Sequence, residues 1–91
     1  MEIRWSPLAV KDLENIRSYI EQDNPDAALG VVLTIYDGCM RLLDFPHLGR
    51  PSLRKKGFRE LLFPPLPYLA VYRLKAETVE IARIYHAAQN R

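Results

Sequence analysis

The sequence predicts an α+β fold in which a strand and an antiparallel two-helix hairpin precede a three-stranded antiparallel meander (β-α-α-β-β-β). The helices are expected to cover one face of the sheet. Two stretches carry apolar residues at spacings of three and four behind helix-start signals. Three later runs are rich in branched and aromatic residues and are separated by turn signals. With 91 residues, the chain has room for one domain, residues 1–91.

The first strand is expected at Glu2–Trp5, where polar and apolar residues alternate. Ser6 is a good N-cap and Pro7 suits the first position of a helix, so the first helix is predicted to begin there and to end near position 22. The apolar stripe of this helix consists of Ala9, Leu13, Ile16 and Ile20.

The second helix has a similar start signal at Asn24 and Pro25, and we expect it to stop at Phe45 because the residue before a proline leaves helical geometry. About two residues join the helices, which predicts a hairpin. Cys39 falls on the buried stripe and is predicted to be a core thiol. Small residues at positions 30, 34 and 38 leave a groove that either accommodates the first helix or admits a second chain.

The meander is expected at residues 58–63, 68–74 and 79–86, and three prolines at 64, 65 and 67 predict an irregular first turn. The tip at residues 75–77 leaves the register of the last two strands open. A three-residue loop puts Arg73 on one face with Arg83, whereas a two-residue loop puts Arg73 opposite Glu80 as a structural ion pair.

Charge is distributed unevenly along the chain. Residues 1–44 contain four Lys and Arg against eight Asp and Glu, a balance of −4, and residues 45–91 contain nine against three, a balance of +6. The half that forms the sheet is therefore expected to attract an anionic partner. Five of its cations lie in or beside the loop before the meander: Arg50, Arg54, Lys55, Lys56 and Arg59.

The composition predicts a cytoplasmic protein without a cofactor. A single cysteine leaves no internal disulfide and suits a reducing compartment. No apolar run has the length of a signal peptide or of a membrane span. The two histidines do not form a cluster with ligand spacing, so no metal site is expected, and no Gly-rich phosphate loop is present.

The candidate binding residues belong to the meander and the loop before it. Guanidinium groups bind phosphates in two-point contacts, aromatic side chains stack on bases, and an imidazole can shuttle a proton near neutral pH. The residues proposed to bind a target or a partner are Arg50, Arg59, Tyr72, Arg73, Arg83, Tyr85 and His86, with Gln89 beside them.

The order of elements and several short motifs resemble the RelE/ParE superfamily of bacterial type II toxin–antitoxin toxins. The resemblance covers nearly the whole chain. Its main segments are Trp5-Ser6-Pro7-Leu8-Ala9, Phe45-Pro46-His47-Leu48-Gly49-Arg50-Pro51, Phe58-Arg59-Glu60-Leu61, Val71-Tyr72-Arg73 and Val79-Glu80-Ile81-Ala82-Arg83-Ile84-Tyr85-His86.

The resemblance implies a toxin that a cognate antitoxin neutralises in a hetero-oligomeric complex. ParE-like members poison DNA gyrase, and RelE-like members cleave mRNA on the ribosome. Leu61, Leu69 and Gln89 stand where cleaving relatives tend to carry cations, and an apolar residue cannot stabilise a phosphorane, which favours the non-enzymatic gyrase inhibitor. In the alternative, a ribosome-dependent mRNA endonuclease, His86 acts as acid or base and three arginines hold phosphate: Arg59, Arg73 and Arg83.

Overall fold

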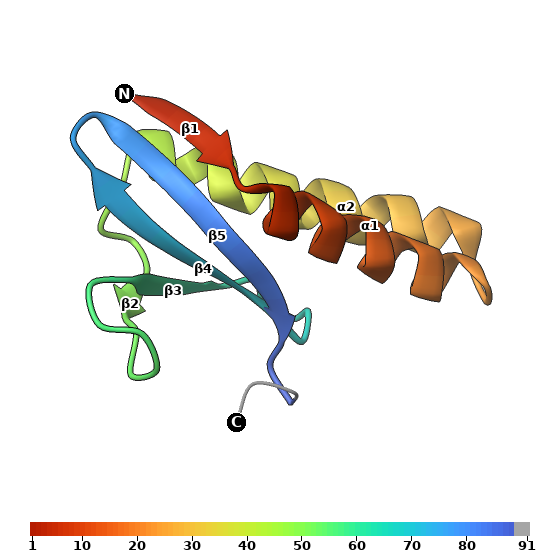
Figure 1. Ribbon diagram of the computed structural model, residues 1–91. Helices are drawn as coiled ribbons and strands as arrows, with labels where there is room; N and C mark the ends of the chain where they lie inside the picture. Colours follow the sequence, from red (N-terminus) through yellow and green to blue (C-terminus); the bar gives the residue numbers. More distant parts are fainter. Residues whose placement is uncertain (89–91) are drawn as a thin grey trace.

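The computed structural model describes residues 1–88 and confirms the predicted fold class and helix hairpin (Figure 1). Strand β1 spans Glu2–Trp5, helix α1 spans Pro7–Glu21, and helix α2 spans Pro25–Met40, followed by a 3-10 turn, η1, at Arg41–Leu43. The remaining strands are β2 (Arg50–Pro51), β3 (Arg59–Leu62), β4 (Tyr68–Lys75) and β5 (Thr78–His86).

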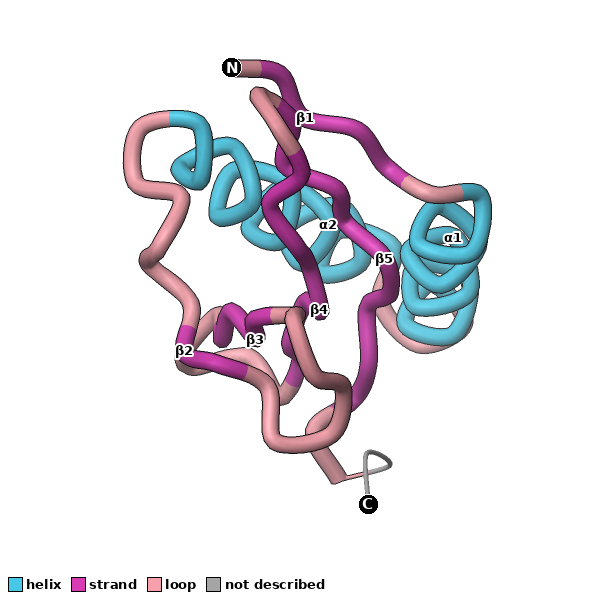
Figure 2. The backbone as a smooth tube through the Cα atoms, turned by 60° about the vertical axis from the view of Figure 1, so that its left-hand side comes forward, coloured by secondary structure: helices cyan, strands magenta, loops and turns pink. Residues whose placement is uncertain are grey.

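The strands form one sheet in the order β1-β5-β4-β3-β2 (Figure 2). β1 runs parallel to the first half of β5, and the other pairs are antiparallel. Two features go beyond the sequence prediction: the two-residue strand β2 and the parallel contact of β1 with β5. Apolar side chains from both helices pack against those of β3, β4 and β5 to form the core.

Both helices begin at the predicted caps. The Ser6 hydroxyl accepts a hydrogen bond from the Ala9 N–H at 3.0 Å, and the Asn24 side chain accepts one from the Ala27 N–H at 3.1 Å. α2 ends earlier than predicted, at Met40, because the chain tightens into η1 before it reaches Phe45. The helix hairpin is therefore anchored at both starts by side-chain caps.

The register between β4 and β5 follows the two-residue alternative. Lys75 pairs with Thr78 across a turn in which Ala76 adopts a φ of 55°. As expected for this register, Arg73 lies opposite Glu80, and the two side chains form an ion pair.

A β-bulge at Ala82 shifts the second half of β5. Tyr72 pairs with Ile81, but the preceding Val71 pairs with Arg83, so one residue of β5 is left over. An extra residue reverses the alternation of side chains beyond it. Arg83 therefore shares a face with Arg73, although the short turn alone would have separated them.

Cys39 is fully buried, and burial raises the pKa of its thiol to about 12, which confirms it as a core residue. The small-residue groove on α2 does not accommodate α1. A Cβ added at Gly38 would lie 2.6 Å from the ring of Phe63, so the groove admits the chain that follows β3, whereas Gly30 has nothing within 4 Å.

Candidate functional site

The register divides the predicted site residues between the two faces of the sheet, because residues paired across strands project to the same side. One face packs against the helices and is called the helix-side face; the opposite one is called the outer face. The helix-side face carries Arg59, Tyr72 and His86. The outer face carries Arg50, Arg73, Arg83 and Tyr85. The seven residues thus form two groups rather than one cluster.

Carboxylates fix Arg73 and Arg83, two of the arginines of the outer face. Arg73 donates from Nε to Glu80, and this hydrogen bond lowers the pKa of Glu80. Arg83 donates from Nε and Nη2 to the two oxygens of Asp12 at 2.7 and 2.9 Å, which raises the pKa of Arg83. The side chains of Arg73 and Arg83 are still 41% and 35% exposed. They are held in position and remain accessible to a partner.

Asp12 also completes the edge of β5. β1 pairs only with the first four residues of β5, and beyond them the Ile84 N–H donates to Asp12 at 3.0 Å while Ser6 donates to the Ala82 carbonyl at 2.7 Å. Sequence reasoning did not select Asp12 as a site residue. One feature of the sequence could have identified it: Asp12 is a charged residue on the apolar side of α1, three positions after Ala9 and four before Ile16.

The outer face carries an open groove in which cations and aromatic rings alternate. Lys55 Nζ lies 4.5 Å from the centre of the Phe58 ring, and Arg73 lies 5.3 Å from the same ring. Arg83 lies 5.0 Å from the ring of Tyr85. Such contacts hold the cations over aromatic faces. The cationic and aromatic residues that line the groove are Arg4, Lys55, Phe58, Arg73, Arg83 and Tyr85; Trp5 borders it too, but its ring stacks on Tyr36 on the helix-side face.

One buried carboxylate organises the basic loop beside this groove. Glu60, whose side chain is 2% exposed, accepts hydrogen bonds from Ser52 and Arg54 at 2.9 Å each and from Arg50 at 3.3 Å. The Ser52 hydroxyl in turn accepts from the Arg54 and Lys55 amides. Sequence reasoning treated this loop as a run of cations and did not assign a role to the acid that directly follows it.

Acid is expected to weaken the fold through Glu60. Burial alone raises the pKa of this carboxyl, but the hydrogen bonds from Ser52 and Arg54 outweigh burial, so its pKa lies below the ordinary 4.5. A lowered folded-state pKa stabilises the fold above the unfolded-state pKa, and this stability is lost as the pH falls through the folded-state value. Thermal unfolding should therefore show a melting temperature that falls below about pH 4.5, with a shallower fall in Glu60→Gln. If the melting temperature fell equally steeply with pH in the wild type and in Glu60→Gln, this role of Glu60 would be contradicted.

Tyr72, by contrast, is part of the core and cannot contact a partner in this conformation. Its side chain is fully buried on the helix-side face. The hydroxyl donates to the Pro46 carbonyl at 2.8 Å and accepts from the Gly49 N–H at 2.9 Å. Arg59 donates to the Gly49 carbonyl, so its guanidinium also fixes the loop that precedes β2. The backbone at Gly49 is thus held in place by hydrogen bonds with Tyr72 and Arg59.

Replacing Tyr72 with phenylalanine is expected to lower the free energy of unfolding by about 1–3 kcal/mol, because the buried Gly49 N–H and the partly buried Pro46 carbonyl lose their partner. For a domain of this size each kcal/mol corresponds to about 4–8 °C in melting temperature. Tyr19→Phe is the matched control, since Tyr19 is 72% exposed. Equal melting temperatures for the two variants would contradict the structural role of the Tyr72 hydroxyl.

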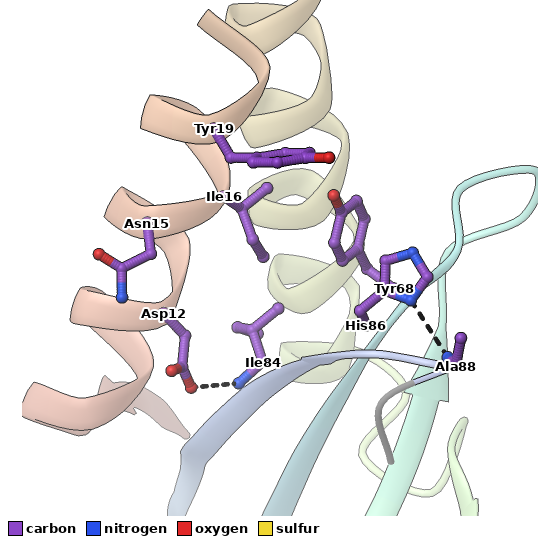
Figure 3. A pocket seen from close by; sticks show the side chains of 8 residues that line it. All are labelled: Asp12, Asn15, Ile16, Tyr19, Tyr68, Ile84, His86 and Ala88. Carbon is purple, nitrogen blue, oxygen red and sulfur yellow. Dashed lines mark hydrogen bonds between the residues drawn. The ribbon is translucent and has the colours of Figure 1, made fainter. Parts of the chain in front are cut away.

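His86 lies in a separate groove between α1 and the end of β5 (Figure 3). Its ring packs edge-on against Tyr68, with 5.3 Å between ring centres, and its Nδ1 accepts from the Ala88 N–H at 3.1 Å. Within residues 1–88 no lysine or arginine lines this groove, whose lining residues are Asp12, Asn15, Ile16, Tyr19, Tyr68, Ile84, His86 and Ala88.

The four residues of the endonuclease alternative are therefore not brought together. Arg73 and Arg83 lie on the outer face, whereas His86 and Arg59 lie on the helix-side face. Gln89, also considered in the sequence, lies outside the described residues. Within residues 1–88, no three His, Cys, Asp or Glu side chains are placed to hold a metal ion, and no helix is long and apolar enough to cross a membrane.

Solved structures share this arrangement of hairpin and sheet, which is a RelE/ParE-like fold. A chain of a chromosomal ParDE toxin–antitoxin system from P. aeruginosa has a TM-score of 0.86 and 29% identity, and the match covers 94% of this chain and 95% of that one. YafQ from E. coli shares the fold at a TM-score of 0.63 and 18% identity, over 96% and 93% of the two chains.

The chain belongs to the ParE toxin family of type II toxin–antitoxin systems, parDE, whose family model matches residues 3–91. Y4kP of Sinorhizobium fredii, named as a candidate toxin, is 42% identical over 87 residues, 96% of this chain and 88% of that protein. Toxin RelE2 of Caulobacter vibrioides is 36% identical over 88 residues, 97% of each chain. The protein is thus the toxin of a ParDE-type system, and such a system implies a cognate antitoxin as partner.

Proposed function

We propose that this toxin binds and inhibits DNA gyrase until its antitoxin sequesters it. The observation that carries the proposal is the separation of His86 from the cations of the outer face, which leaves that surface without the histidine that the endonuclease alternative requires. Cleavage of RNA without a metal needs a base, an acid and a cation at one phosphate. Inhibition by binding needs only a fixed complementary surface.

The outer face is the surface we assign to the target. Arg73 and Arg83 are each partly neutralised by a carboxylate, but Arg4 and Lys55 line the same groove and keep its charge positive. Fixed cations lose little conformational freedom on binding, and aromatic rings beside them add contact area. The assigned contact residues are Arg50, Arg73, Arg83 and Tyr85; Tyr72 is excluded because it is buried.

The cognate antitoxin is proposed to neutralise the toxin by covering this outer face in a hetero-oligomeric complex. A basic surface fits an acidic segment, since complementary potentials speed association and exclude wrong partners. Binding of antitoxin and of gyrase would then be mutually exclusive.

A supercoiling and cleavage-complex assay with purified toxin tests the proposal. Gyrase supercoiling should stop at saturating toxin, and addition of the cognate antitoxin in excess should restore it. Gyrase that remains active at saturating, correctly folded toxin would overturn the proposed target.

The endonuclease alternative has one observation in its favour, the open groove in which the His86 imidazole lies beside the Tyr68 ring, with Tyr19 further along the same groove (Figure 3). Primer extension on translated mRNA separates the two functions. Cuts positioned by codon that disappear in His86→Ala would establish the nuclease, whereas intact mRNA is the result that the gyrase proposal predicts.

A further inference from the structure

A compact loop at residues 52–58 projects beside the outer face, and its backbone is closed at its base. The Ser52 N–H donates to the Phe58 carbonyl at 2.8 Å, and the Phe58 N–H donates to the Lys55 carbonyl at 3.1 Å. The hydrogen bonds of Glu60 to Ser52 and Arg54 hold the loop from inside. A loop with these contacts keeps one shape and presents its tip in a fixed position.

Next to Ser52, at the base of the loop, stands a leucine whose side chain is almost entirely exposed to water. Leu53 is 97% exposed, more than any other large apolar residue among those described. The segment from Arg50 to Arg59 contains five cations; Glu60 binds two of them, Arg50 and Arg54, and Arg59 lies on the helix-side face. Lys56 is exposed in the same loop, and Lys55 turns toward Phe58 in the groove. The loop therefore holds one apolar side chain among positive charges.

This chemistry fits a nucleic-acid duplex better than a protein surface. Energetic centres of protein interfaces are enriched in Trp, Tyr and Arg and poor in Leu, and a single exposed leucine is not an apolar patch. Proteins that bend DNA insert one apolar side chain, often Leu, Ile or Phe, between base steps. Lysines and arginines on either side of such a wedge contact the phosphates.

We propose that residues 52–58 form a DNA-contacting wedge, in which Leu53 enters a base step while Lys56 contacts a flanking phosphate. The inference rests on the proposed function, because DNA is the substrate of gyrase and is present wherever the toxin meets its target. The toxin then contacts two parts of one complex: the enzyme through the groove of the outer face, and the DNA through this loop.

Fluorescence anisotropy with a short labelled DNA duplex, without gyrase, tests the wedge. Leu53→Ser should weaken binding about tenfold or more with an unchanged salt slope, because it removes an apolar contact and no charge. Lys56→Gln should reduce the slope of log K against log salt by about 1. Leu29→Ser is the matched control, since Leu29 is also exposed, on α2, and should bind as the wild type does.

The outcomes separate this proposal from the proposed function. No binding to the duplex, or binding by Leu53→Ser equal to wild type, overturns the wedge even if gyrase is inhibited. A loop-dependent interaction with DNA by a toxin that leaves gyrase active supports the wedge and overturns the target. If Leu53→Ser weakens binding to gyrase or antitoxin alone and leaves DNA binding intact, the loop is a protein contact and the proposal is wrong.

Discussion

Replacing Gly49 with alanine is expected to lower the free energy of unfolding by about 3 kcal/mol, at the upper end of the usual cost of overpacking a core. A Cβ at this position would lie 2.7 Å from the Tyr72 ring and 2.8 Å from the Glu60 carbonyl oxygen. Both neighbours are buried, so neither can move aside cheaply. The displaced loop would also lose the hydrogen bond from the Gly49 N–H to the Tyr72 hydroxyl. Urea denaturation at equilibrium measures the change.

The helix glycines provide the controls for this prediction. Gly30→Ala should raise the free energy of unfolding by up to about 1 kcal/mol, because alanine is the better helix former and nothing lies within 4 Å of the added Cβ. Gly38→Ala should be destabilising, since the Phe63 ring lies 2.6 Å away. Equal effects at Gly49 and Gly30 would show that the close approach around Gly49 does not constrain the fold.

Reversing two charges beside the groove is expected to weaken gyrase inhibition by at least about tenfold, a usual size for electrostatic steering. Lys55→Glu/Lys56→Glu changes side chains for which the structure records no ion pair, so the fold should be retained. The same double change adds negative charge where the acidic antitoxin segment is proposed to bind, and should weaken that complex as well. Both effects should shrink as salt is raised.

Lys11→Glu is the control for these reversals, because Lys11 is an exposed cation of α1 and does not line the groove of the outer face. It should inhibit gyrase as the wild type does. Equal loss of inhibition in both variants would mean that net charge, rather than the outer face, determines inhibition.

The sequence predicted the elements whose signals are local. Ser6 and Asn24 cap their helices as expected, and Cys39 lies in the core, because caps and apolar stripes are read from neighbouring residues. The turn allowed two registers of β4 and β5, and only one of them pairs Arg73 with Glu80. The sequence could not choose between these registers.

What the sequence could not predict depends on long-range pairing. A bulge at Ala82 leaves no local signal, yet it decides which face carries Arg83 and Tyr85. The burial of Tyr72 follows from its pairing with Arg59 on the helix-side face, which the sequence left open. The sequence also did not show that Arg73 and Arg83 are held in ion pairs, by Glu80 and Asp12 respectively.

The most direct test compares supercoiling inhibition by wild-type toxin, His86→Ala and Lys55→Glu/Lys56→Glu over one range of concentrations. If the outer face is the working surface, His86→Ala inhibits gyrase at the wild-type concentration and the lysine variant needs at least about ten times more. Loss of inhibition in His86→Ala together with full inhibition by the lysine variant would place the activity in the opposite groove and contradict the assignment.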